Sequence, residues 1–174
     1  MIKTSRRRAK AAWIAGVTTL TVAASAAVGV VSSAAADPPA PIAAEALTAR
    51  SVFTDEIHMK LRLKEDQGET AVVEVDDPSR TVVVRYTVQP GAQFPWHSHA
   101  GPVFVNLISG ELTYIEADTC AETRYTSGQA FVDPGQGHVH SAVNRGTTPT
   151  VFIATFYAAP AEGGLLIPAE PGAC

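Results

Sequence analysis

The sequence is poor in the residues that mark nucleic-acid and membrane-surface binding. Charged residues make up 17% of its 174 residues, against 46% hydrophobic ones. Five of the 13 basic residues lie in the first ten positions, and without them eight basic residues face 17 acidic ones, a net charge of −9. A domain with this charge repels nucleic acid and anionic membrane surfaces, so we expect neither as a partner.

The first 36 residues have the pattern of an export signal. The basic segment "MIKTSRRRAK" precedes the apolar "AAWIAGVTTLTVAASAAVGVV" and then the small residues "SSAAA". These are the three parts of a secretory signal peptide. We expect cleavage between Ala36 and Asp37, and a secreted or extracytoplasmic protein. Residues 11–31 are also long enough to span a bilayer, so an uncleaved membrane anchor is the alternative.

Cysteine is scarce as well, since Cys120 and Cys174 are the only two in the chain. Export would bring them into a compartment where disulfides persist. We therefore expect a bridge between Cys120 and Cys174, which would tie the C-terminal end to the domain. Two free thiols and an intermolecular bridge are the alternatives.

The region after the signal has no helical periodicity of convincing length. It consists of short β-rich runs separated by Gly, Pro, Asp and Asn. The runs are "HMKLRLK", "RTVVVRYTV", "PVFVNLI", "ELTYIEA", "AFVD", "HVHSAVN" and "TVFIATFYA". Regular short strands with such turns predict an all-β sandwich or barrel. We assign the barrel to residues 51–160, the Pro/Ala-rich segment 37–50 to a linker, and residues 161–174 to a C-terminal tail held by Cys174.

Four of the five histidines form two closely spaced pairs, His97/His99 and His138/His140. In a strand, residues two apart point to the same face, so each pair would project together. If the two strands are neighbours, three or four imidazoles converge on one point. Clustered neutral imidazoles suit Zn, Cu, Fe or Ni better than Mg or Ca. The alternative is that each histidine is an ordinary hydrogen-bonded core or surface residue.

Two stretches of the sequence resemble the two conserved motifs of the cupin family. "GAQFPWHSHAGPVFVNLISG", from Gly91 to Gly110, resembles the first motif, and "GQAFVDPGQGHVHSAVN", from Gly128 to Asn144, resembles the second. The resemblance implies a single cupin-type β-barrel, or jelly roll, after the N-terminal signal segment. It also implies three metal ligands, His97, His99 and His140.

The sequence departs from the cupin pattern at Val103, which stands where the family has a metal-binding glutamate. No carboxylate lies between His99 and Gly110 to replace it. Three imidazoles alone would leave open positions on the ion, similar to the zinc of carbonic anhydrase and to the three-histidine iron of some dioxygenating cupins. Additional candidates are His138, as a fourth ligand, a general base or part of the barrel mouth, and Gln93.

These patterns predict an exported single-domain cupin that binds a divalent metal, with Fe, Zn, Ni and Cu as candidates. It would act on a small molecule, as a dioxygenase or other metal-dependent enzyme. The alternatives are a barrel that binds a metal or small ligand without turnover and a barrel that serves as an interaction module. By analogy with other cupins we also consider a homodimer, in which "HMKLRLK" would be an exposed or exchanged edge strand.

Overall fold

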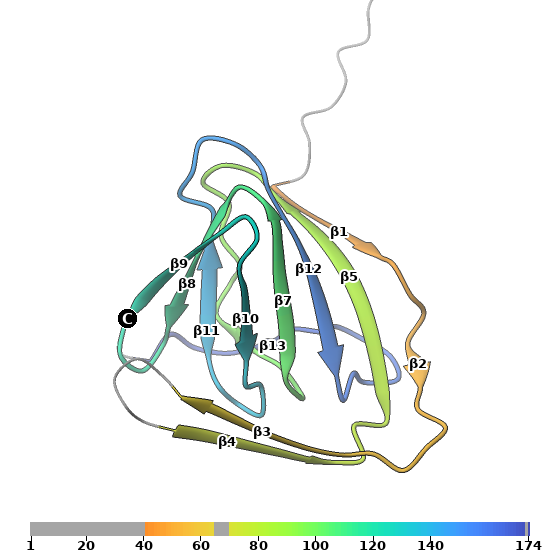
Figure 1. Cartoon of the computed structure of the whole chain (residues 1–174). Helices are drawn as coiled ribbons and strands as arrows, with labels where there is room; N and C mark the ends of the chain where they lie inside the picture. Colours follow the sequence, from red (N-terminus) through yellow and green to blue (C-terminus); the bar gives the residue numbers. More distant parts are fainter. Residues whose placement is uncertain (1–40, 65–69, 173) are drawn as a thin grey trace, which may run out of the picture. The chain divides into compact units, whose positions relative to one another are not determined.

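The computed structural model describes residues 41–64, 70–172 and 174. The predicted signal segment 1–36 and residues 37–40 of the predicted linker lie outside these residues. In the described part of the chain the regular elements are all strands, and no helix there is long and apolar enough to cross a membrane (Figure 1). The prediction of an all-β fold is therefore confirmed.

The larger of two main sheets has the strand order β1-β5-β12-β7-β10, with β2 also paired to β5 (Figure 1). Its strands are β1 (Ile42–Ala46), β2 (Ser51–Val52), β5 (Arg80–Val88), β7 (Val103–Ser109), β10 (Ala130–Asp133) and β12 (Thr150–Tyr157). All the pairings in this sheet are antiparallel.

The second sheet has the order β13-β6-β11-β8-β9 and contains His97 and His140. Its strands are β6 (His97–Ser98), β8 (Glu111–Glu116), β9 (Glu122–Thr126), β11 (His140–Val143) and β13 (Ile167–Pro168). A separate hairpin pairs β3 (His58–Lys64) with β4 (Thr70–Asp76). The sheets are consistent with the predicted jelly roll.

Alternation of apolar residues along the strands builds the core. On β5, every second residue from Val82 to Val88 is buried, and the same pattern runs from Thr150 to Phe156 on β12. This is the period of a strand with one face in the core. Together with β7 these strands form an apolar wall behind the histidines, because the buried side chains of all three belong to one cluster.

Part of the predicted linker is not a linker. Residues 42–46 form β1, which pairs with residues 84–88 of β5 and extends the edge of the larger sheet. Four of the five β1 side chains are exposed, so the strand depends on backbone hydrogen bonds rather than on apolar burial. A prediction from hydrophobic alternation has nothing to detect in such a strand.

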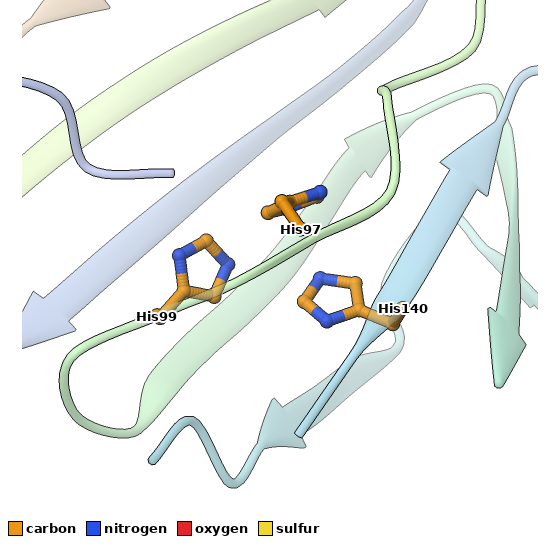
Figure 2. Close-up of side chains that lie close together, drawn as sticks. All are labelled: His97, His99 and His140. Atoms are coloured by element: carbon orange, nitrogen blue, oxygen red, sulfur yellow. The ribbon is translucent and has the colours of Figure 1, made fainter. Parts of the chain in front are cut away.

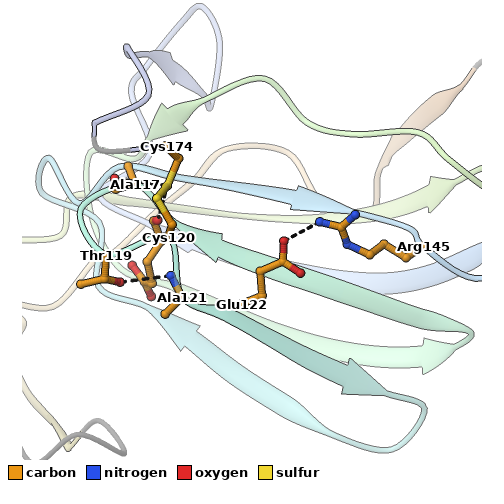
Figure 3. The surroundings of a disulfide bond; sticks show 8 residues. Ala117, Thr119, Cys120, Ala121, Glu122, Arg145 and Cys174 are labelled. Atoms are coloured by element: carbon orange, nitrogen blue, oxygen red, sulfur yellow. Dashed lines mark hydrogen bonds and ion pairs between the residues drawn. A yellow bond between two sulfur atoms is a disulfide. The ribbon is translucent and has the colours of Figure 1, made fainter.

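The C-terminal tail contributes a strand to the histidine-bearing sheet. In β13, Ile167 lies opposite Ser98, and Pro168 lies opposite His97. The end of the tail is close to the β8–β9 turn, where Cys120 and Cys174 lie at disulfide distance with Cα atoms 5.5 Å apart (Figure 3). The tail is therefore held at two points, by the pairing of β13 with β6 and by the contact between Cys120 and Cys174.

Candidate metal centre

Three histidines converge in the interior between the sheets. His97 and His140 are direct partners in the antiparallel β6–β11 pairing, and His99 follows β6 by one residue. Their ring centroids are 4.3 Å apart for His97 and His140, 4.8 Å for His97 and His99, and 5.2 Å for His99 and His140. All three are buried, and one ligand atom from each lies within 4.8 Å of the others. The side chains point toward one another (Figure 2).

Backbone carbonyls fix the rings of the first pair. The Nδ1 atom of His97 lies 2.6 Å from the carbonyl oxygen of Pro95, and that of His99 lies 2.8 Å from the carbonyl oxygen of Leu165. A carbonyl can only accept, so in both rings Nδ1 carries the proton. The Nε2 atom then keeps a free lone pair, which is what a metal ion needs from a histidine ligand.

Burial also keeps these imidazoles uncharged. It lowers the pKa of His97 to about 4, with the nearby His140 adding to the effect. Burial likewise lowers the pKa of His99, against the opposing influence of Asp133. Both rings are therefore neutral at physiological pH, the state in which histidine binds metals.

The third ring faces a carboxylate instead of a carbonyl. The Nδ1 atom of His140 lies 3.0 Å from Oδ2 of Asp133, yet the two atoms are not aligned as a hydrogen bond and this buried nitrogen has no other partner. The Asp133 carboxylate is therefore the nearest acceptor for this nitrogen, and a small rotation of the His140 ring would align the two atoms. In all three histidines, Nδ1 therefore lies within 3.0 Å of an oxygen atom.

The histidines line a cavity of about 50 Å³ whose other walls are mostly apolar. Val103 lines the same cavity, with 2% of its surface exposed. The cavity has room for an ion and a small molecule such as water, which needs roughly 10–15 Å³. Phe94, Phe152 and Phe156 line it from β12 and from the segment before β6.

The central part of the chain matches a known family. Residues 84–156 match the family model Cupin_2, described as a cupin domain. Residues 84–156 form a cupin domain. No curated protein matches the chain in sequence.

Solved structures similar to this cupin domain come from several bacteria. The polyketide cyclase RemF from Streptomyces resistomycificus is 18% identical, with a TM-score of 0.44 over 52% of this chain and 61% of the cyclase. A conserved protein with a double-stranded β-helix domain from Klebsiella pneumoniae is 23% identical, with a TM-score of 0.43 over 69% of this chain and 90% of that chain. KdgF from Halomonas sp. is 22% identical, with a TM-score of 0.40 over 45% of this chain and 69% of that chain.

The two members of the second histidine pair, His138 and His140, lie in different surroundings. His140 faces the cavity, whereas His138 precedes β11 and lies between two carboxylates. Its Nε2 atom is 2.6 Å from Glu116 and its Nδ1 atom is 3.3 Å from Asp133. Hydrogen bonds to Asp133 and then Glu116 raise the pKa of His138 to about 10, so this ring is positively charged. It also lines a surface groove beside β3 rather than the metal cavity.

Gln93 is not brought into the histidine cluster. Its side chain is exposed, and its amide donates a hydrogen bond to the Ser141 hydroxyl, at 2.9 Å. Gln93 and His97 are four residues apart, but they do not lie on one strand face because Pro95, between them, is outside any strand. Gln93 supports β11 from the side instead.

Two functional side chains were missed by sequence reasoning, Asp133 and Tyr114. Asp133 is buried at the end of β10, and the Tyr114 hydroxyl donates a 2.5 Å hydrogen bond to it. Burial and the neighbouring Asp133 charge raise the pKa of Tyr114, which keeps it a donor. Strand alternation could have placed Asp133 on the same face as Phe131, two residues earlier. Its position before a proline, however, is typical of a turn.

A close approach of two loops helps to fix this carboxylate. The backbone N–H of Gly135 donates to Oδ1 of Asp133, at 2.8 Å. Gly135 has a positive φ of 65°, and a Cβ atom there would lie 2.1 Å from the carbonyl oxygen of Gly101. Only glycine fits, and the neighbouring Gln136 N–H then donates to the carbonyl of His99. The loop before the second histidine pair is thereby joined to the end of the first.

Proposed function

We propose that this protein is an exported cupin that binds one divalent transition metal through Nε2 of His97, His99 and His140. The observation that carries the proposal is the orientation of three buried rings around one cavity, each with an oxygen atom beside Nδ1. Such partners fix the tautomer and turn the other ring nitrogen toward an ion. Three neutral imidazoles suit Fe, Zn, Ni or Cu.

The site supports chemistry as well as binding. Three ligands leave coordination positions open, and the cavity of about 50 Å³ has room for a small molecule bound to the ion. The catalytic form of the proposal is a metal-dependent oxygenase that acts on a small molecule, and the other form is a barrel that binds the metal or a small ligand without turnover. Iron in the purified protein would favour the oxygenase, whereas zinc or nickel would be compatible with both.

The export half of the proposal rests on the N-terminal 36 residues. The mature protein would begin at Asp37 and lie outside the cytoplasm. N-terminal sequencing of protein recovered from outside the cytoplasm checks this. A first residue at Met1 in membrane-bound material would support the anchor instead.

Metal content tests the central claim. We expect protein purified without a histidine tag to contain about one divalent metal ion per chain by elemental mass spectrometry, and the double variant His97→Ala/His99→Ala to contain none. The matched control is His58→Ala, because His58 is an exposed imidazole on the β3–β4 hairpin. Stoichiometric metal in the double variant, or no metal in the wild type after loading, would overturn the proposal.

A further inference from the structure

One buried carboxylate faces the three histidines. Among the described residues that line the metal cavity, Asp133 is the only acidic one, and 2% of its surface is exposed. It lies at the end of β10, directly opposite Val103 of β7. The cavity wall therefore places its single negative charge beside an apolar side chain and next to His140.

Four polar groups surround the Asp133 carboxylate. Oδ1 accepts from the Gly135 N–H at 2.8 Å, while Oδ2 lies 2.5 Å from the Tyr114 hydroxyl, 3.0 Å from His140 Nδ1 and 3.3 Å from His138 Nδ1. Contacts of this number fix both the position and the plane of the carboxylate.

Two carboxylates flank the single ring of His138, which lies between Asp133 and Glu116. A divalent ion held by three neutral imidazoles carries its full charge of +2 into a mostly apolar cavity. An uncompensated charge in such surroundings is unfavourable, so a nearby fixed negative charge strengthens binding.

We propose that Asp133 is the positioning residue of the metal centre. Its Oδ2 atom holds the proton of His140 on Nδ1, directs Nε2 of that ring to the ion, and supplies the negative charge that the ligands lack. The inference rests on the proposed function, since it assumes an ion bound by His97, His99 and His140. Partners of this kind, next to the ligand rather than on the metal, commonly change metal affinity 10- to 100-fold.

The first test is Asp133→Asn, which keeps the shape of the side chain and removes its charge. We expect Co²⁺ affinity, measured by competition with a chromophoric chelator, to fall roughly 10- to 100-fold, with a changed visible absorption spectrum of the bound ion. The matched control is Glu116→Gln, which removes the outer carboxylate of His138 and should weaken Co²⁺ less than about threefold, because Glu116 is partly solvated. Thermal melts of the metal-free variants establish that each is folded.

A folded Asp133→Asn protein with wild-type affinity and spectrum would overturn the inference and leave the three-histidine site intact. Wild-type protein that binds no Co²⁺ would overturn the proposed function and this inference together. If Asp133→Asn does not fold, the wild type still decides. In protein labelled with ¹⁵N-histidine and loaded with ¹¹³Cd²⁺, we expect metal coupling to Nε2 of His140 and a proton on its Nδ1. Coupling to Nδ1 of His140 would overturn the inference.

Discussion

His97 and His99 share one cavity, whereas His138 and His140, with the same spacing, are divided between that cavity and a surface groove. The pKa of His97 is lowered to about 4 by burial, while hydrogen bonds to Asp133 and Glu116 raise that of His138 to about 10. The same two-residue spacing thus produces a neutral ring in one place and a cation in the other.

The difference comes from the backbone and from the partners. β11 begins at His140, and the residues before it, Gln136 and Gly137, have positive φ angles of 54° and 91°. His138 and residue 139 lie between this turn and β11, outside any strand, so strand alternation does not place His138 on the face of His140. The first pair has carbonyl partners, which carry no full charge, and the second pair has carboxylates. A two-residue spacing therefore indicates a shared face only where both residues lie in extended backbone.

The largest expected effect distinguishes the two members of the second pair. His140→Ala should lose stoichiometric metal, because it removes one of three ligands. His138→Ala should retain about one ion per chain, with affinity reduced less than about tenfold through its contact with Asp133. Elemental analysis and chelator competition on both variants check this. Loss of metal in folded His138→Ala protein would show that both pairs supply two ligands.

The next effect concerns the support of the first pair by the C-terminal tail. Leu165 accepts from His99, and β13 pairs with β6, so the tail contacts the first pair. We expect Cys120 and Cys174, 54 residues apart, to be oxidised in the mature protein, and their reduction to cost up to about 4 kcal/mol of the free energy of unfolding. A melt with and without reductant measures it.

The control for reduction is the variant Cys120→Ala/Cys174→Ala, whose melting temperature should not respond to reductant. Histidine NMR adds a second readout, since reduction should shift the resonances of His99 more than those of His138. Two alkylatable thiols found by mass spectrometry in exported protein would contradict the prediction.

The smallest effect adds a carboxylate to the surroundings of the first pair. Val103 lines the metal cavity, so Val103→Glu should add an oxygen ligand and raise the affinity for Mn²⁺ roughly tenfold, since carboxylates suit harder ions. The control Val103→Gln has the same length without the charge. Titration of Mn²⁺, beside a thermal melt of each variant, measures the change. An unfolded variant or an unchanged affinity would show that residue 103 packs as core and does not point at the ion.

Strands with strong alternation were predictable from the sequence, and others were not. The runs at 58–64, 80–88 and 130–133 match β3, β5 and β10 residue for residue. β1 and β9 were missed because most of their side chains are exposed, so no hydrophobic pattern marks them. Backbone hydrogen bonds can pair a strand whatever its side chains are, so residue types do not indicate such a strand. β4 (Thr70–Asp76) was also missed, although Val73 and Val75 alternate on its buried face.

The histidine cluster was predictable, but its surroundings were not. His97, His99 and His140 follow from spacing and from the resemblance to cupins, and they do converge. Asp133 contacts His140 across the turn between β10 and β11, and Leu165 contacts His99 from 66 residues away. A residue pattern cannot predict which backbone carbonyl binds a histidine, because every residue has a carbonyl.

The position of β13 separates the histidine cluster from its supports along the chain. All three histidines lie at or before residue 140, but the carbonyl that holds His99 and the strand that pairs with His97 belong to residues 165–168. Removal of residues 165–168 would therefore leave all three histidines in place and take away both supports. The apolar wall of β5, β7 and β12 ends at Tyr157, so it would stay complete while the rings of His97 and His99 lost the contacts that orient them.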